Sequence, residues 1–232
     1  MQSDEKYKSL VSFNRLILAV PHPDDETYYS AGLIQRLNSL GKFLKVIVMT
    51  KGENSTLRYG VLENENLPDV REKEFMKIIR ILGVTHYALN KFKDGGIESE
   101  SDKVSKYLSS EIEGIKPDAV VTYEPSGVYG HPDHVALTKI IEELSKIYPF
   151  EIIYLTVGSS YNTFEDAVHM AKDPDSIKPI EPDLVLKLTS LETINKLRAI
   201  LAYKSQFKFD LEFVWKLLRR RLLTREFLKL NV

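Results

Sequence analysis

The chain has 232 residues, of which 43% are hydrophobic and 28% charged, and 32 basic side chains nearly balance 33 acidic ones. This length and composition indicate one globular domain with a substantial apolar core, and the net charge of −1 does not favour nucleic acid or a membrane surface as the main partner. Because the sequence has no cysteine, disulfides, thiolate zinc sites and cysteine nucleophiles are excluded, and any metal must be held by histidine and carboxylate.

The first residues show no leader or anchor pattern. Residues 1–8 are polar and of mixed charge, and the apolar run at 16–20 is far shorter than a signal sequence or a membrane span requires. The sequence therefore predicts a cytoplasmic protein with no membrane-spanning segment.

Apolar periodicity predicts alternating strands and helices along most of the chain. Strands are expected at 16–20, 45–50, 86–89, 119–122 and 152–156. Helices are expected at 31–40, 68–82, 102–115, 134–147, 191–202 and 211–230. This order is typical of a single α/β domain over residues 1–232, with a Rossmann-like, three-layer fold in which helices cover both faces of a mostly parallel sheet.

Two segments stand apart from this alternation. Residues 158–183 contain three prolines and no regular pattern, which favours a long loop or small insertion near the site. Residues 216–225 interleave basic residues with leucines, as in an amphipathic helix that packs on the body of the protein or on another subunit. The C-terminal helix is therefore a candidate contact in a homo-oligomer.

Two similar motifs each follow an apolar, strand-like run. They are His22-Pro23-Asp24-Asp25-Glu26 and His131-Pro132-Asp133-His134, and together they hold three of the five histidines. Ligands of open α/β sheets bind beyond the carboxyl ends of the strands, and a proline in the first turn of a helix makes a stiff corner. Two such corners predict a mononuclear metal site, and therefore an enzyme.

The motifs offer more candidate ligands than one metal needs. Zinc sites with an open position commonly use three protein ligands and a water. Six side chains are candidates: His22, Asp24, Asp25, His131, Asp133 and His134. Spacing alone does not choose among them. One such motif could simply cap a helix with its aspartate, but two copies favour a site, and the surplus suits hydrolysis, which also needs a base and an electrophilic group.

At these residues the sequence resembles the LmbE-like, or PIG-L, family of zinc-dependent N-acetylglucosaminyl deacetylases. The resemblance rests on residues 19–26, where the family has an AHPDDE pattern, and on residues 122–134, which contain the second motif. Weaker matches are Arg71-x-x-Glu74, Leu82-Gly83-Val84, Asp94-Gly95, Lys196-x-x-Ala199 and Ser205-Gln206. The resemblance covers residues 16–206, and its C-terminal part is the least specific.

The resemblance implies an activity and a set of roles. One zinc ion per chain would have three ligands: His22, Asp25 and His134. Asp24 would be the general base, while His131, with help from Tyr129, would stabilise the oxyanion. Arg71 and Asp94 match positions that contact the sugar. The implied reaction is hydrolysis of the N-acetyl group of a small-molecule substrate, an N-acetylglucosamine-type amino sugar or its conjugate.

Three positions depart from the family pattern and affect the expected sugar pocket rather than the ligands. Glu124 stands where aspartate is frequent, Val128 where glycine is common, and Tyr203 where histidine is often found. The activity class is therefore better specified than the substrate.

Two other functions fit the same residues. Two histidines and a carboxylate also describe non-haem iron enzymes, and a non-catalytic sugar-binding protein could retain the metal for structure. His86 and His169 lie outside both motifs and are expected to be hydrogen-bonded or surface residues. The sequence has no GxGxxG or P-loop motif, so a nucleotide cofactor is not indicated.

Overall fold

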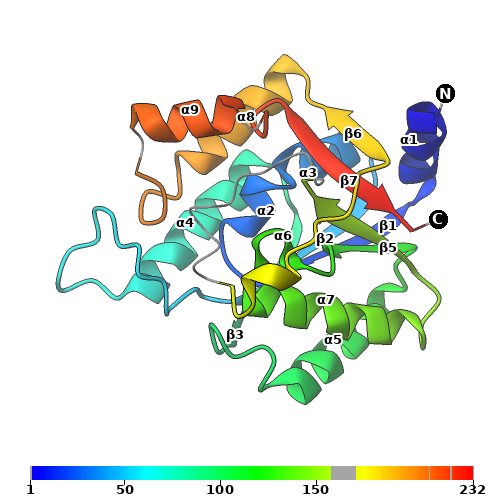
Figure 1. The fold of residues 1–232 in the computed structure, drawn as a ribbon, viewed down its shortest axis with the longest axis horizontal. Helices are drawn as coiled ribbons and strands as arrows, with labels where there is room; N and C mark the ends of the chain where they lie inside the picture. The colour runs from blue at the N-terminus through cyan, green and yellow to red at the C-terminus, as the bar shows by residue number, and fades with distance from the viewer. Residues whose placement is uncertain (1, 158–170, 209, 220, 232) are drawn as a thin grey trace.

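The computed structural model describes residues 2–157, 171–208, 210–219 and 221–231, which form a seven-stranded sheet in the order β3-β2-β1-β4-β5-β7-β6 (Figure 1). The strands are β1 (Arg15–Val20), β2 (Phe43–Thr50), β3 (His86–Phe92), β4 (Ala119–Tyr123), β5 (Glu151–Thr156), β6 (Leu184–Lys187) and β7 (Arg225–Leu230). Pairings among β1 to β5 are parallel, and β7 pairs antiparallel with β5 and β6. The predicted α/β class with a mostly parallel sheet is confirmed.

Helices cover both faces of this sheet. They are α1 (Gln2–Ser12), α2 (Asp25–Tyr28), α3 (Ala31–Ser39), α4 (Leu67–Ile81), α5 (Ser101–Ile115), α6 (Gly127–Gly130), α7 (Pro132–Ser145), α8 (Ser190–Ile200) and α9 (Leu211–Arg219), with a short 3₁₀ turn at Pro174–Ser176. Figure 1 shows α3, α4 and α8 on one face and α5 and α7 on the other. Among the described helices, none is both long and apolar enough to cross a membrane.

The inner strand β1 contributes side chains to a hydrophobic core on each face of the sheet. Leu16, Leu18 and Val20 pack into the core under α3, α4 and α8, whereas Ile17 and Ala19 pack into the core under α5 and α7. Successive side chains of a strand point to opposite faces, so a strand covered on both faces reads as a continuous apolar run. Helices α3 and α4 end within one residue of the predicted positions, because Gly41 and Gly83 adopt positive φ angles of 67° and 71° just after them.

The predicted helix at 211–230 is wrong in its second half. Helix α9 ends at Arg219, and residues 225–230 form β7, inserted between β5 and β6. The leucine spacing there fits a helix locally, but the edge of β5 offers backbone partners, and the inserted strand buries Phe227 and Leu228. Tertiary pairing overrides the local pattern.

The predicted loop at 158–183 is tested only in part. Residues 158–170 lie outside the described residues, and 171–183 hold the 3₁₀ turn and irregular backbone. The strand that follows, β6, was not predicted, because its four residues are too short to show a clear period.

The sheet order fixes where a site can form. From β1 the chain moves to β2 and β3 on one side, whereas β4 leads to β5 on the other, so the order reverses between the adjacent strands β1 and β4. Ligands of open α/β sheets bind at such a switch point, beyond the carboxyl ends of the strands. The first histidine motif follows β1 directly, and the second follows β4 after the short helix α6, so the fold places both near this point.

Candidate metal centre

The two motifs meet in one buried cluster. The ring centroids of His22 and His131 lie 4.7 Å apart, those of His131 and His134 lie 5.0 Å apart, and the three residues place ligand nitrogens within 4.8 Å of one another. Asp25 reaches two of these rings, with Oδ2 3.4 Å from His22 Nδ1 and Oδ1 3.5 Å from His134 Nε2. The second motif thus supplies nitrogens, and the first supplies both a nitrogen and a carboxylate.

The contacts of His134 leave one of its ring nitrogens directed toward Asp25. Burial lowers the pKa of His134 to about 3, so its ring is neutral, and Nδ1 lies 3.2 Å from the carbonyl oxygen of Gly127. The ring proton is therefore on Nδ1, and the lone pair of Nε2 faces Asp25 Oδ1. A bound cation would satisfy a nitrogen lone pair and a carboxylate oxygen that face each other in a buried site.

The surroundings of His22 favour positive charge. Burial lowers the pKa of His22, but hydrogen bonds to Asp133, Asp25 and Asp94 outweigh burial and hold the pKa well above its usual value. Its Nε2 lies 3.0 Å from Asp94 Oδ1 and 3.2 Å from Asp133 Oδ2, while Nδ1 faces Asp25. Imidazole nitrogens beside a carboxylate are a ligand set that zinc accepts, and the residues present fit that metal.

Asp133 connects the two motifs with the loop after β3. Its carboxylate accepts the backbone N–H groups of Gly95 at 2.7 Å and Ile97 at 3.1 Å, and it faces His22 Nε2. Its own backbone N–H donates to His131 Nδ1 at 3.2 Å. Asp133 therefore orients one histidine through its side chain and another through its backbone.

Replacing Asp133 by asparagine is expected to weaken Zn2+ binding about 10- to 100-fold, because partners of ligating histidines contribute about that much to metal affinity. Competition with a chromophoric chelator measures the change. Asp118→Asn is the matched control, since Asp118 also accepts two backbone N–H groups, from Asn14 and Arg15, away from the motifs. Equal zinc affinities of the Asp133 variant and the parent would contradict the orienting role.

Asp24 occupies an unusual backbone conformation at the mouth of the cluster. Its φ angle is 119°, rare for a residue with a Cβ, and its side chain is 23% exposed. Burial raises the pKa of Asp24 to about 8, against the nearby Arg71 guanidinium, which lowers it. Asp24 is thus a carboxyl group suited to taking up a proton near neutral pH.

His131 directs a ring N–H group, a hydrogen-bond donor, toward the region that Asp24 also faces. Burial lowers the pKa of His131 to about 4, so the ring is neutral, and its Nδ1 accepts the backbone N–H of Asp133. Its ring proton is therefore on Nε2. Tyr129 lies close by, with its hydroxyl 3.4 Å from His134 Nε2.

A cavity of about 480 Å³ opens onto these groups. Six of the eight predicted site residues line it: His22, Asp24, Arg71, Asp94, Tyr129 and His131. Residues 54–57, after β2, and Gln206, after α8, line it as well. The eight predicted site residues therefore lie in one region, with Asp25 and His134 buried beneath the lining.

Sequence reasoning missed Tyr123. This residue ends β4, is fully buried, and donates its hydroxyl to Asp25 Oδ1 at 2.7 Å. Its ring also stacks on His134 with centroids 4.1 Å apart. The available signal was a tyrosine at the carboxyl end of a buried strand, since a buried tyrosine hydroxyl usually requires a hydrogen-bond partner.

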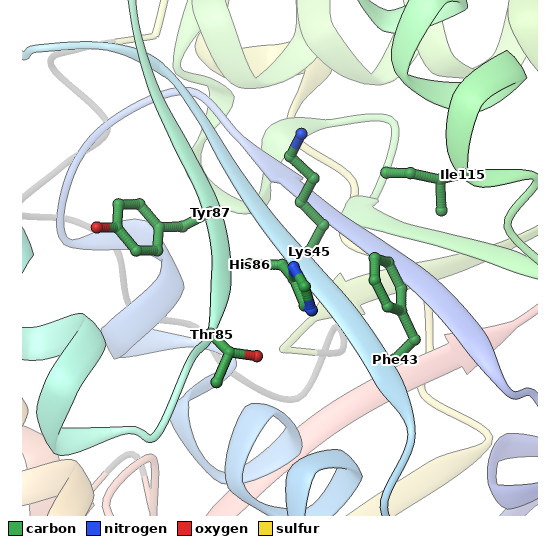
Figure 2. Close-up of a pocket in the computed structure, with 6 residues that line it drawn as sticks. All are labelled: Phe43, Lys45, Thr85, His86, Tyr87 and Ile115. Carbon is green, nitrogen blue, oxygen red and sulfur yellow. The ribbon is translucent and has the colours of Figure 1, made fainter.

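His86 lies at the opposite end of the strands. Figure 2 shows it in a second pocket, beside Phe43 and Lys45 at the start of β2. Its ring lies 4.6 Å from that of Phe43. The prediction that His86 is not a ligand of the motif cluster agrees with this position, and His169 lies outside the described residues.

Comparisons with known proteins agree with this arrangement. A family model described as "PIG-L: GlcNAc-PI de-N-acetylase" matches residues 17–145. A 1D-myo-inositol 2-acetamido-2-deoxy-alpha-D-glucopyranoside deacetylase of Corynebacterium diphtheriae is 30% identical over 160 residues, which are 60% of this chain and 54% of that protein. The chain thus spans about half the length of that relative.

Two further matches cover more of the chain. A probable N-acetyl-alpha-D-glucosaminyl L-malate deacetylase 2 of Bacillus cereus is 28% identical over 204 residues, covering 85% of this chain and 86% of the relative. The structure of N,N'-diacetylchitobiose deacetylase from Pyrococcus horikoshii superposes with a TM-score of 0.70 at 20% identity, over 98% of this chain and 92% of that one. This last match shows that the fold is shared.

Proposed function

Because the chain belongs to the PIG-L family, we propose that it is a zinc-dependent hydrolase that removes the N-acetyl group from an N-acetylglucosamine-type amino sugar or its conjugate. The observation that carries the proposal is the position of Asp24 and His131, which line the same cavity as His22, next to Asp25 and His134. A structural metal site needs neither a base nor a proton donor in an open cavity. The names of the relatives supply the substrate class.

The proposed roles come from the family resemblance and are supported by contacts in the structure. His22, Asp25 and His134 would hold one zinc ion, with Asp133 behind His22. When bound, zinc supplies a Lewis acid and lowers the pKa of a coordinated water to about 7.

The remaining steps belong to side chains of the cavity. Asp24 takes the proton from the attacking water as general base, and either Asp24 or His131 protonates the amine nitrogen as the C–N bond breaks and acetate is released. His131 donates its Nε2 proton in a hydrogen bond to the acetamide oxygen as negative charge develops there, and Tyr129 supports the same oxygen. Asp94 binds sugar hydroxyls, since its buried carboxylate lines the cavity.

Acetate release tests this function directly. Zinc-loaded protein is incubated with N-acetylglucosamine, N,N'-diacetylchitobiose, and N-acetylglucosamine linked to inositol or to malate. We expect acetate from at least one of these, loss of activity after chelation, and recovery when Zn2+ is added back. A zinc-loaded protein that releases no acetate from any of them would contradict the proposal.

The same samples separate the two alternatives. Metal analysis of unchelated protein showing bound iron, together with substrate-dependent oxygen uptake, would indicate a non-haem iron enzyme. Sugar binding without acetate release would indicate a binding protein. The cytoplasmic location, the homo-oligomer and the absence of nucleic-acid and membrane partners stay predictions of the sequence.

A further inference from the structure

The guanidinium group of Arg71 is buried and forms hydrogen bonds to other groups of the protein. It lies in the first turns of α4, is 2% exposed, and extends toward the corner after β1. Its NH1 donates to the carbonyl oxygen of Gly52 at 3.1 Å, and its NH2 donates to the carbonyl oxygen of Pro23 and to Asp24 Oδ2, the latter at 3.1 Å. One side chain thus joins the loop after β2 to the first histidine motif.

These contacts surround the strained residue of the site. Asp24 has a φ angle of 119°, and a non-glycine residue keeps such a conformation only where its surroundings hold it. Arg71 bonds the carbonyl group that precedes Asp24 and also the carboxylate of Asp24. Both the backbone and the side chain of this residue are therefore fixed from one point.

Gly52 makes room for the guanidinium. A Cβ atom at residue 52 would lie 2.0 Å from Arg71 NH1 and 2.4 Å from Arg71 Cζ, distances that van der Waals radii forbid. The carbonyl oxygen of the same residue accepts the NH1 hydrogen bond. A side chain at this position would push the guanidinium away from Asp24.

We propose that Arg71 is a positioning residue that fixes the carboxylate of Asp24 for proton transfer, and that Gly52 is required for this placement. The set of Arg71, Gly52, Pro23 and Asp24 is named the Arg71 clamp. This inference rests on the proposed function in one respect, the role of Asp24 as base, and it assigns Arg71 a role other than the sugar contact that the family resemblance implies.

The two roles predict different kinetics. A residue that binds the sugar in ground state and transition state alike changes KM, whereas a residue that aligns the base changes kcat. A planar guanidinium can bond acceptors in two directions, while an ammonium group is a point charge on a flexible stem. Arg71→Lys therefore keeps the charge and removes the geometry.

For Arg71→Lys we expect kcat to fall about 10- to 100-fold, because a displacement of about 1 Å in a reacting group can cost that much. KM should stay within about twofold, and Zn2+ affinity should not change. Arg80→Lys is the control, since it makes the same replacement at an exposed position of the same helix. A rise in KM with unchanged kcat would overturn the clamp and support the sugar contact.

Gly52→Ala tests the clamp without altering a charged group. Gly52 and Gly60 have nearly the same φ angles, +65° and +66°, but a Cβ at residue 60 meets nothing within 4 Å. Both alanine variants therefore carry the same backbone strain, and only Gly52→Ala displaces Arg71. We expect the Gly52 variant to lose kcat as Arg71→Lys does, and the Gly60 variant to retain it. Equal kcat values for the two would overturn the proposal.

A double-mutant cycle makes the test independent of activity. Arg71→Lys, Asp24→Asn and the double variant are compared by urea unfolding, and contact between the two residues predicts non-additive changes in stability. Additive changes would overturn the clamp. Non-additive changes together with a wild-type protein that releases no acetate would reject the proposed function and leave the clamp in place.

Discussion

Replacing Asp24 by asparagine is expected to lower kcat for acetate release about 10³-fold, within the range of about 10² to 10⁴ that general acid–base groups contribute. The amide has nearly the shape of the carboxyl group but cannot accept a proton from the attacking water. KM should change less than about threefold, because the carboxylate of Asp24 shares the cavity but is not proposed to bind the sugar. Steady-state kinetics with zinc-loaded protein measure both constants.

Two controls accompany this variant. Zn2+ affinity, measured by chelator competition, should match that of the parent, since the proposed ligands are the neighbouring residues. Asp102→Asn makes the same chemical change on the exposed surface of α5 and should leave kcat unchanged. Equal rates of acetate release by the Asp24 variant and the parent would show that another group is the base.

The Glu226→Gln variant is expected to lose about 3–5 kcal/mol of unfolding free energy, the usual consequence of removing one partner of a buried ion pair. Lys196 Nζ lies 2.7 Å from Glu226 Oε1, and both side chains are completely buried. The same carboxylate accepts the backbone N–H groups of Gly32 and Leu33, each at 2.7 Å, at the start of α3. Urea unfolding at pH 7 measures the loss.

The pH dependence of the unfolding free energy tests whether the unpaired charge of Lys196 causes this loss. Burial lowers the pKa of Lys196, although the attraction of Glu226 opposes this shift. Between the folded-state pKa and the higher unfolded-state pKa, Lys196 carries its proton mainly in the unfolded chain, so the free energy of unfolding rises with pH. In Glu226→Gln the stability should therefore recover as pH rises, because a neutral Lys196 needs no partner. Glu143→Gln, which removes one member of the exposed pair with Lys146, should change stability little. A similarly small loss for Glu226→Gln would contradict the importance of the buried pair.

Glu226 also shows how far the sequence could predict the C-terminal region. Residues 211–230 carry a helix-like spacing of leucines, yet among the described residues of this range only 211–219 are helical. Residues 225–230 form β7, which pairs with β5 and β6 and bonds to Lys196 and to the start of α3. All of these partners lie far from β7 in the sequence. Those contacts leave no periodic signal along the chain.

The active region was more predictable. Both motifs follow buried strands, and the carboxyl ends of parallel strands lie at one edge of a sheet, so their convergence follows from the pattern. Family resemblance then selects His22, Asp25 and His134 as ligands. No local pattern reveals that Tyr123 bonds Asp25, or that Arg71 bonds Asp24 rather than pointing into solvent.

The sequence by itself thus determined the α/β class, the strand ends that carry chemistry and the residue types available to a metal, because apolar periodicity and motif spacing are local properties of the chain. The tertiary structure decided that β1 and β4 are neighbours, which brings His22 within 3.2 Å of Asp133 across 111 residues. It also decided the orientation of each imidazole and the placement of Asp24. These features depend on hydrogen bonds and close packing between segments far apart in sequence, which exist only once the chain has folded.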